Sequence, residues 1–559
     1  SLCALGAVSV LSAQAQAPGV MSSVTSDPSV EIIDRGQDFA VYRSISTITN
    51  ENGQASYTTN QFTLIENGLH YLEDGVWKPS EDVLEPFDGG AIARRGPNKA
   101  IFNADLNAEA VFDIEMADGK RLRGGVRAIQ LTDLKTGQSV VLATVKDSAP
   151  GELLPPDQIV YREAFDGLKA DLLMVWRHNL FSHDVVLRER PELPAGWDPA
   201  AVRLEVITEF VEAPVPELLR QWVGREGEEK LEDHAVIDFG AMVMLMGHGF
   251  PVEGQRAWAV GGPPPAPGAT PILKQYYEGP DGRRFLVESI AWPDAERQWK
   301  DLPVAKRADA ATPLPEQPEG ARAFGMRRQA QRDAALAART TSSSRTEKAV
   351  VAGAAQSAPR IWPEPRPWSS ERKPIAVAQL DYAPTGYVVD FFIIPDQGSP
   401  STFLTGWTYY IKNNYWVGSA YFQPGCTIKF KNNASLTAYA WIDFPATGTA
   451  PVFTSRNDNG FGERIIGVPG ETDSNGDPTL HRASVALMVY YVGWNTELKN
   501  ARIRWAQTGV NYQDDCGAGQ WHTVQDSLFE YCPTGIYMYM SCGGVVLNNV
   551  KKCTVTTPI

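Results

Sequence analysis

Near its end the chain carries LKNARIRWAQTGV (498–510), which returns in outline as VQDSLFEYCPTGI (524–536) and as LNNVKKCTVTTPI (547–559). Asn500, Asp526 and Asn549 occupy one position of this pattern, and the Gly or Pro near its end follows at the same distance in each segment. The interval from Asn500 to Asp526 is slightly longer than that from Asp526 to Asn549. A period in the twenties with apolar positions in register is typical of a solenoid, in which each repeat buries its face against its neighbours.

The residues between these positions are mostly Val, Ile, Tyr, Phe and Thr, with turn residues separating short runs. Such side chains suit strands, so the repeat predicts coils of strands rather than pairs of helices. Side chains one repeat apart should lie on top of each other, and Asn at a turn tolerates a left-handed backbone. The expected stacks are Ile503 on Phe529; Val510, Ile536 and Ile559; and a turn ladder of Asn500, Asp526 and Asn549.

A passage upstream of the repeats supports this interpretation. It reads PGCTIKF at 424–430, ASLTA at 434–438 and PVFTS at 451–455, followed by Asn457-Asp458. Together with the repeats it resembles secreted bacterial proteins of the right-handed parallel β-helix class, which open their coil with a passage of the form PGTxIKF, LxxxG and PIxFTS. The resemblance covers about 150 residues and implies a right-handed parallel β-helix, of which 376–559 would hold the first rungs. It implies no particular activity.

The first half of the chain reads instead as a series of β-hairpins. Short alternating segments are separated by Asn-Gly and Asp-Gly turns, which are the strongest local signals for a hairpin. Helical periodicity is nearly absent, so we predict an antiparallel, sandwich-like β domain over residues 30–300. The expected hairpin turns are Glu66-Asn67-Gly68, Asp74-Gly75, Asp118-Gly119, Thr136-Gly137 and Pro280-Asp281-Gly282.

The composition changes between the two expected domains. Residues 301–375 are rich in Ala, Arg, Gln, Ser, Thr and Pro, with few β-branched or aromatic side chains. Such a segment buries too little apolar surface to offset the entropy of ordering it, so we expect a disordered linker. The 559-residue chain is therefore predicted to be all-β, with two folded domains.

The first residues resemble the remainder of an export signal. A small apolar run at 2–11 precedes Ala13-Gln14-Ala15, which fits the small-x-small rule for signal peptidase and makes residues 1–15 a signal-peptide remnant. The chain starts at Ser1 without a basic segment and stops at Ile559 inside a repeat, so we expect a fragment truncated at both ends. No apolar run reaches the roughly 20 residues that a membrane-spanning helix needs. We therefore expect an extracellular or cell-surface protein.

The net charge of −15 limits the choice of partners. It argues against binding to nucleic acid or to an anionic membrane surface, and it suits a protein kept soluble outside the cell. The sequence holds no phosphate-binding glycine loop, no His-Glu-x-x-His and no Gly-x-Ser-x-Gly, so we expect no cofactor.

Cys516 and Cys542 are separated by the same interval that relates Asn500 to Asp526. In a coil of strands they would lie one above the other, about 4.8 Å apart, within the Cα separation that a disulfide tolerates. A Cys516–Cys542 bridge and a pair of buried free thiols both fit this spacing. The sequence has no Cys-x-x-Cys pair, so structural zinc is not expected.

One passage raises the question of catalysis. Gln513-Asp514-Asp515-Cys516 resembles the QDDC passage of polygalacturonases, β-helix enzymes in which paired aspartates and a third acidic residue cleave a glycosidic bond. The resemblance would make Asp514 and Asp515 two of the three catalytic acids. The family's Asn-Thr-Asp-Gly has only a partial counterpart at 495–498, and its Gly-His-Gly is absent. We therefore interpret both aspartates as solvated loop residues.

Two other groups raise the question of a metal. Asp473, Asn475 and Asp477 have the spacing of the first calcium ligands in an EF-hand loop, but proline stands where that loop requires glycine. A turn is the simpler interpretation, and a calcium site completed by remote oxygens is the alternative. His178 and His183 are five residues apart, which on a strand places them on opposite faces. We interpret both as surface histidines rather than metal ligands.

These observations favour a secreted or cell-surface, non-catalytic scaffold or binding module built on a β-helix, with a polysaccharide or another cell-surface polymer as its partner. The alternative is a polysaccharide-degrading enzyme, either a polygalacturonase-like glycosidase or a lyase, with most of its site beyond residue 559. Charged residues aligned on one outward sheet over several turns of the coil would favour the enzyme. Outward sheet faces without aligned charged residues would favour the scaffold.

Overall fold

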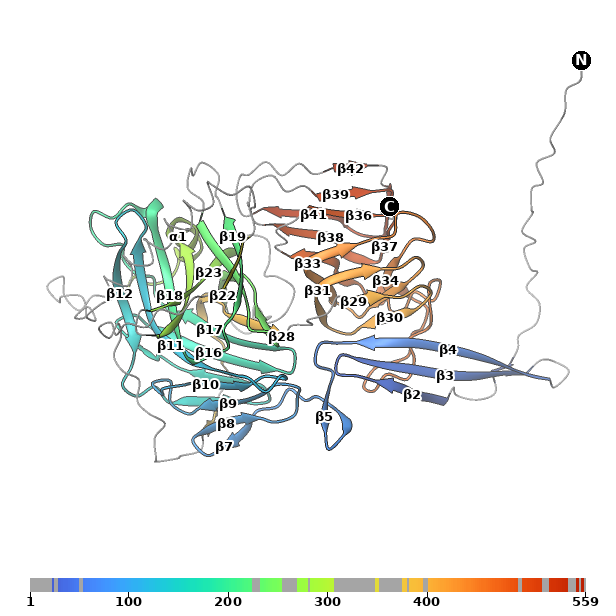
Figure 1. Cartoon of the computed structure of the whole chain (residues 1–559), viewed down its shortest axis with the longest axis horizontal. Helices are drawn as coiled ribbons and strands as arrows, with labels where there is room; N and C mark the ends of the chain where they lie inside the picture. Colours follow the sequence, from blue (N-terminus) through green and yellow to red (C-terminus); the bar gives the residue numbers. More distant parts are fainter. Residues whose placement is uncertain are drawn as a thin grey trace, which may run out of the picture.

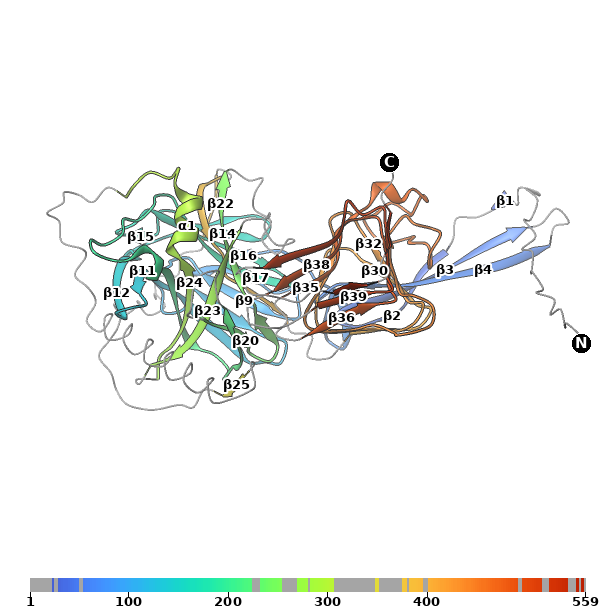
Figure 2. The ribbon, with the colours of Figure 1, turned by 90° about the horizontal axis from the view of Figure 1, so that it is seen from above.

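The computed structural model describes an all-β protein with two packed parts (Figure 1). One part is built mainly of antiparallel strands and the other is a stack of parallel strands, as the view from above also shows (Figure 2). The structure describes residues 23–24, 29–49, 54–223, 232–253, 269–279, 282–305, 347–350, 375–379, 382–395, 401–490, 495–514, 522–540, 549–551 and 554–556.

We call strands β7 to β28 the antiparallel region. Their pairings form one series that closes on itself, around a core of large side chains such as Phe102, Phe112 and Phe181. The helix α1 (Trp292–Trp299) follows β24 and buries Trp292, Ala295 and Trp299. The strands are β7 (Glu85–Phe87), β8 (Gly90–Ala93), β9 (Lys99–Asn103), β10 (Phe112–Glu115), β11 (Arg121–Asp133), β12 (Gln138–Val145), β13 (Gly151–Leu154), β14 (Gln158–Tyr161), β15 (Phe165–Asp166), β16 (Ala170–Arg177), β17 (Leu180–Leu187), β18 (Val202–Glu212), β19 (Glu217–Val223), β20 (Glu232–Asp238), β21 (Met242–Met244), β22 (Gly247–Glu253), β23 (Thr270–Glu278), β24 (Arg284–Ala291), β25 (Glu347–Val350), β26 (Ala376–Val377), β27 (Thr385–Val389) and β28 (Phe392–Pro395).

Several predicted hairpins are confirmed. β10 pairs with β11 across Asp118-Gly119, and β11 pairs with β12 across Thr136-Gly137. β23 pairs with β24 around a turn whose Pro280 and Asp281 lie outside the described residues. Outside this region, Asp74-Gly75 joins a small hairpin of β5 (His70–Glu73) and β6 (Val76–Pro79). Turn chemistry therefore predicted these neighbours correctly.

We call the second part the parallel stack, and we call one full circuit of its chain a rung. Each of the first three rungs adds one strand to each of two parallel sheets, and each of the last three adds one to each of three sheets. We name these sheets the β30, β31 and β36 sheets. The β30 sheet contains β30 (Thr408–Ile411), β32 (Thr427–Phe430), β34 (Val452–Ser455), β37 (Arg502–Arg504), β40 (Leu528–Glu530) and β43 (Thr554–Thr556). The β31 sheet contains β29 (Ser401–Phe403), β31 (Asn414–Phe422), β33 (Ser435–Asp443), β35 (Ala483–Tyr490), β38 (Ala506–Asp514) and β41 (Thr534–Met540), and the β36 sheet contains β36 (Thr496–Lys499), β39 (His522–Gln525) and β42 (Asn549–Lys551).

The predicted stacking of the first two repeats is confirmed. Ile503 pairs with Phe529 and Val510 pairs with Ile536, both in parallel register and with the same interval along the chain. Ile503, Phe529 and Val510 are fully buried in the stack. Ile536 is partly buried and packs against the same core. Identical intervals in two sheets show that the whole rung, and not one strand, is the repeating unit.

The third repeat lies elsewhere than predicted. Asn549 pairs with Thr523, and Phe529 pairs with Val555. The interval between paired residues is therefore the same as in the first two repeats. The shorter interval that we expected from Asp526 to Asn549 is wrong. Asn549 therefore does not join Asn500 and Asp526, which both have a φ of 50° at their turn. Similar residue types suggested the wrong alignment, because backbone pairing fixes the period. Ile559 lies beyond the described residues.

The strand pairings cross both expected domain boundaries. β4 (Ala55–Ile65) was expected in the N-terminal domain, but its last three residues pair in parallel with β30 of the stack. β4 also pairs over its whole length with β3 (Phe39–Thr49), which in turn pairs with β2 (Ser29–Arg35) and β1 (Ser23–Val24). The turn at Glu66-Asn67-Gly68 therefore does not close a hairpin.

The second crossing lies at residue 376, where the β-helix was expected to begin. β26, β27 and β28 pair with strands of the antiparallel region, namely β13, β17, β21 and β22. Alternation of apolar residues identifies a strand but not its partner, which explains both differences. The expected signal remnant at 1–15, and all of the expected linker except 301–305, 347–350 and 375, lie outside the described residues.

The two parts pack through a shared apolar cluster. Leu180, Val243 and Met246 of the antiparallel region contact Trp416 and Tyr490 of the β31 sheet. The Tyr490 hydroxyl donates a hydrogen bond of 2.7 Å to the Met246 carbonyl. Leu180 of this cluster also lines a polar cavity at the edge of the contact.

Candidate functional site

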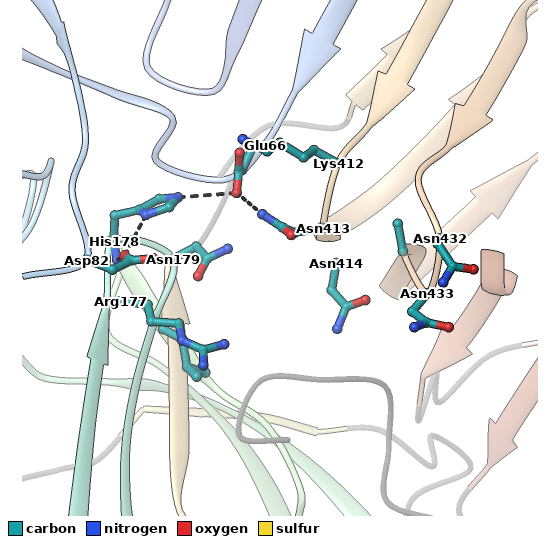
Figure 3. Close-up of a pocket in the computed structure, with 12 residues that line it drawn as sticks. Glu66, Asp82, Arg177, His178, Asn179, Lys412, Asn413, Asn414, Asn432 and Asn433 are labelled. Carbon is teal, nitrogen blue, oxygen red and sulfur yellow. Dashed lines mark hydrogen bonds and ion pairs between the residues drawn. The ribbon is translucent and has the colours of Figure 1, made fainter. Parts of the chain in front are cut away.

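A cavity of about 310 Å³ lies where the antiparallel region meets the first rungs of the stack (Figure 3). One wall comes from the end of β16 and the turn into β17, and the other from the corners that follow β30 and β32. Its lining is mostly charged and amide side chains. The volume lies within the range of small-ligand sites. We call it the junction cavity.

The tripeptide Glu66-Asn67-Gly68 connects the two parts beside this cavity. The Asn67 carboxamide accepts a hydrogen bond from the Trp416 N–H and donates one to the Trp416 carbonyl, both at 2.8 Å. Gly68 has a φ of 66°, and a Cβ there would lie 2.8 Å from the His178 carbonyl oxygen, so this position requires glycine. The tripeptide thus touches the stack through Asn67 and the antiparallel region through Gly68.

His178 is held between two carboxylates at the cavity wall (Figure 3). Its Nδ1 lies 2.7 Å from Asp82 Oδ1, and its Nε2 lies 3.5 Å from Glu66 Oε1. Burial alone would lower the pKa of His178, but Asp82 and Glu66 outweigh burial and raise this pKa to about 10. The ring is therefore an imidazolium at neutral pH.

The two carboxylates are held in their charged form as well. Burial alone would raise the pKa of Glu66 and that of Asp82. The hydrogen bonds and positive charge of His178 outweigh burial and lower both pKa values. A general acid or base needs a pKa near the working pH, and none of these three groups has one at neutral pH.

Two successive corners of the stack bring asparagines to the opposite wall. Lys412-Asn413-Asn414 follows β30, and Lys431-Asn432-Asn433 follows β32. β30 and β32 are paired in parallel up to Ile411 and Phe430, so these corners lie one rung, or about 4.8 Å, apart. The Asn413 amide donates a hydrogen bond to Glu66, which links this corner to the charged trio.

The outward face of the β30 sheet is the place where a polysaccharide-degrading enzyme would hold its groove. Lys429 of β32 lies on this face and is fully buried, because the insertion 456–482 between β34 and β35 covers it. Its Nζ donates a hydrogen bond of 3.0 Å to the Asp458 carbonyl, and burial lowers its pKa to about 8. Arg456 and Glu471 of the insertion pair with each other, and their side chains are each only 3% exposed.

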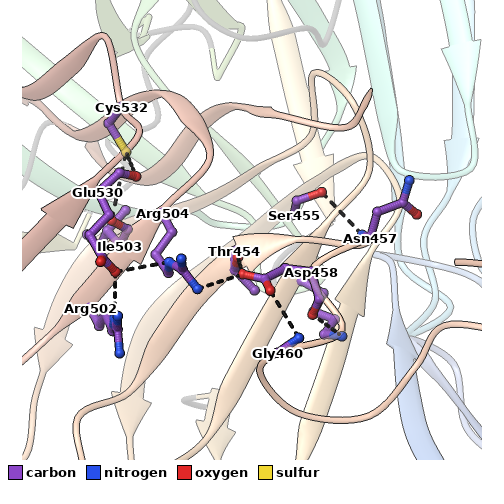
Figure 4. A network of polar contacts seen from close by, with 11 residues as sticks. Thr454, Ser455, Asn457, Asp458, Gly460, Arg502, Ile503, Arg504, Glu530 and Cys532 are labelled. Atoms are coloured by element: carbon purple, nitrogen blue, oxygen red, sulfur yellow. Dashed lines mark hydrogen bonds and ion pairs between the residues drawn. The ribbon is translucent and has the colours of Figure 1, made fainter. Parts of the chain in front are cut away.

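The insertion is fastened to later rungs by a polar network (Figure 4). Arg504 lies 2.9 Å from Asp458 and 3.0 Å from Glu530, and Arg502 lies 2.6 Å from the same glutamate. The guanidinium carbons of Arg502 and Arg504 lie 4.6 and 4.7 Å from the centre of the Phe461 ring. These charges neutralise one another, so the network ties the insertion to the later rungs.

Asp514, one of the two residues singled out for catalysis, lies away from the junction cavity. Asp514 is the last residue of β38 and pairs with Met540 through the backbone. That strand lies three positions along the β31 sheet from β31, which borders the cavity. Asp515, Cys516 and Cys542 lie outside the described residues.

The candidate calcium residues each stabilise their own loop. Asp473 accepts a hydrogen bond of 2.7 Å from Gly467 N, and Asn475 accepts one of 2.9 Å from Asp477 N. Asp477 caps a 3-10 turn by accepting from Thr479 N at 3.0 Å. Where the chain is described, no cluster of three or more His, Cys, Asp or Glu side chains is arranged to hold a metal ion.

The interpretation of His183 as a surface residue is wrong, and His178 is only partly exposed, at the wall of the junction cavity. His183 is fully buried in the antiparallel core, where its ring stacks on Phe391 at a centroid distance of 3.7 Å. Burial, helped by the charge of Lys274, keeps the pKa of His183 well below its usual value, so its ring is neutral. The partners of both histidines come from segments distant in the sequence, and spacing along one strand does not show such partners.

One part of the junction cavity had a signal in the sequence. Lys-Asn-Asn occurs twice, at 412–414 and 431–433, directly after Ile411 and Phe430. In a coil of strands such a repeat marks equivalent corners of neighbouring rungs. The ion trio had no such signal, because Glu66, Asp82 and His178 come from separate elements and match no motif.

Comparison with family models, curated proteins and solved structures finds no match for this chain. Within the described ranges, no helix has the length and apolar character needed to cross a membrane.

Proposed function

We propose that this chain is a secreted or cell-surface, non-catalytic module that binds carbohydrate in the junction cavity. We further propose that its scaffold is a right-handed parallel β-helix joined to a β-sandwich. The parallel register that the last rungs share in two sheets supports the coil, as does the passage at 424–455 that resembles proteins of that class. Export agrees with the signal-like residues 1–15 and with the net charge of −15.

The charge state of the ion trio carries the proposal of a non-catalytic role. Glu66 and Asp82 have lowered pKa values, and the pKa of His178 is about 10. At neutral pH none of the three readily gives or takes a proton, whereas glycoside hydrolysis requires a protonated acid beside an ionised base or nucleophile. Fixed charges and amides, in contrast, are suited to holding hydroxyl groups.

Retention on insoluble polysaccharides tests this function. We expect the chain to be retained on at least one of cellulose, xylan, mannan, chitin or cross-linked pectate, and to release no new reducing ends from any of them. Asn433→Gly should reduce retention, because it removes an amide from the cavity wall. If no polymer retains the protein, or if reducing ends appear, the proposal is wrong.

A polysaccharide-degrading enzyme is the second candidate, because charges do line the outward face of the β30 sheet. Lys429, with a pKa of about 8, lies on this face with Arg504 and Glu530. The insertion 456–482 would have to move before a polymer could reach Lys429. For this candidate, reducing ends should appear with pectic polymers and should be lost in Lys429→Met.

A further inference from the structure

We propose that the junction cavity takes a neutral, linear oligosaccharide that lies along the axis of the stack and contacts two successive rungs. This inference rests on the proposed carbohydrate-binding function and adds the chemical class of the ligand, its direction and its minimum length.

The first argument is the charge balance of the cavity wall. His178 is placed between Glu66 and Asp82. Arg177 Nε lies 3.3 Å from Asp157 Oδ2, and Lys412 adds one further positive charge near Glu66. The lining itself therefore holds three cations and two carboxylates, and Asp157, which pairs with Arg177 from outside the lining, supplies the third carboxylate that offsets them. An acidic sugar would find no excess of positive charge to offset its desolvation, whereas a neutral sugar needs none.

The second argument is the chemistry of the uncharged lining. Five of the lining residues are asparagines, namely Asn179, Asn413, Asn414, Asn432 and Asn433. A carboxamide both donates and accepts hydrogen bonds, and so does a hydroxyl group. Amides from the two facing walls can therefore bind a chain of hydroxyls from both sides.

The third argument is the repeat of the wall itself. Lys-Asn-Asn recurs on two rungs about 4.8 Å apart, and Ile411 and Phe430 before it are in register. The second corner is two residues longer, because Asn414 pairs with Ser435, so a ligand made of repeating units meets amides on both rungs at similar rather than identical positions. On the next rung the corresponding corner is 456–458, where the insertion starts and where Asn457 and Asp458 are buried. The repeated surface therefore ends after two rungs, which suits a short stretch of a longer chain.

Calorimetric titration with a panel of sugars tests the inference. The panel contains cellotriose, xylotriose, mannotriose, chitotriose and trigalacturonate, together with the monosaccharide of each. We expect one neutral trisaccharide to bind at least tenfold more tightly than its monosaccharide, and to bind equally at low and at high salt. Screening by salt weakens ionic binding but hardly affects hydrogen bonds between neutral groups.

Two variants locate the site. Asn433→Gly removes an amide while keeping the backbone, because Asn433 has a φ of 65° that glycine adopts freely. We expect affinity to fall about tenfold, the usual effect of one or two lost hydrogen bonds. Asn500→Gly is the matched control, since Asn500 also has a left-handed φ of 50° but lies at a different corner of the stack, between β36 and β37. It should bind as the unaltered protein does.

The outcomes separate this inference from the function on which it rests. Salt-sensitive binding of trigalacturonate alone would overturn the neutral class while keeping a carbohydrate-binding function. Equal affinity for monosaccharide and trisaccharide would overturn the two-rung orientation. Unchanged affinity in Asn433→Gly would place the ligand elsewhere. No binding in the panel, with polymers still retaining the protein, would also overturn the inference.

Discussion

The antiparallel region and the parallel stack bury their side chains in different ways. In the stack, each rung repeats one pattern, so Ile428, Phe453, Ile503 and Phe529 form a continuous apolar column. In the antiparallel region, Lys274 and Glu288 are both buried, with Nζ 3.6 Å from Oε1. The repeated core depends on register, whereas the antiparallel core also depends on a particular pair of charges.

The buried pair also changes the electrostatics of its surroundings. Burial lowers the pKa of Lys274 and raises that of Glu288 to about 8. Each partner is stabilised by the other, so loss of one leaves an uncompensated group in the interior. The stack column contains no such group, and a change there should cost only packing.

Lys274→Met should produce the largest loss of stability. Removal of one partner of a buried pair costs about 3–5 kcal/mol, because the Glu288 carboxyl is left in the interior without the group that satisfies it. The double variant Lys274→Met with Glu288→Leu should recover most of this loss. Urea denaturation followed by tryptophan fluorescence measures both, and a single variant within about 1 kcal/mol of the unaltered protein would contradict the role given to the pair.

Ile503→Ala tests the apolar column and should be the next largest effect. Truncation of a fully buried isoleucine costs about 2–5 kcal/mol, through lost transfer energy and the cavity left behind. Ile503→Val is the milder control, at about 1 kcal/mol. If the alanine variant were as stable as the valine variant, the close stacking of Ile503 on Phe529 would be refuted.

His178→Gln should have a smaller effect that depends on pH. Hydrogen bonds to charged groups contribute about 1.5–3 kcal/mol. The folded pKa of His178 is about 10 against an ordinary value of 6.5, so its contribution is complete below about pH 6.5 and is lost as pH rises through 10. The free energy of unfolding of the unaltered protein should therefore fall between pH 7 and 10.

The same experiment in His178→Gln supplies the control. Its free energy of unfolding should vary less over this alkaline range, because the titrating ring is gone. Glu66 and Asp82 act at the other end of the scale: their lowered pKa values give stability that is present above about pH 4.5 and is lost on further acidification. Parallel alkaline profiles in variant and parent would contradict the ion trio.

Asn500→Ala should give the smallest effect. Asn500 has a φ of 50°, and an alanine in that left-handed conformation costs about 1 kcal/mol. Asn500→Gly should lose less than the alanine variant, because glycine carries no such cost and both variants lose the same exposed hydrogen bond from Asn500 to the Gly448 carbonyl. Thermal unfolding of the two variants measures the difference, and equal losses would show that the turn conformation is unimportant.

The sequence predicted the stack better than the antiparallel region for a physical reason. Ile503 and Phe529 are related by one period that backbone pairing imposes on every residue of the rung, so two repeats were enough to place them. Our prediction aligned Asn549 with Asp526 because both are turn-forming residues. The constant interval between paired residues aligns Asn549 with Thr523 instead. The corner repeat at 412–414 and 431–433 was also readable from the sequence, although its interval is shorter and its register shifts across the corner.

The partners across the junction could not be predicted in this way. His178 meets Glu66 and Asp82 because three separate elements converge, and no local pattern encodes that convergence. Strand alternation likewise identified β4 as a strand, but its parallel pairing with β30 joins residues from opposite ends of the sequence. Long-range partners of this kind depend on the packing of whole layers rather than on spacing.

Hydrogen–deuterium exchange with the tightest-binding saccharide of the panel tests the central claim most directly. It shows whether the ligand covers the junction cavity or the outward face of the β30 sheet. We expect slower exchange at 177–179, 412–414 and 431–433, with no change at 502–504 and 528–530. Protection on the outward face of the β30 sheet, with the junction cavity unaffected, would contradict a binding site between the two parts.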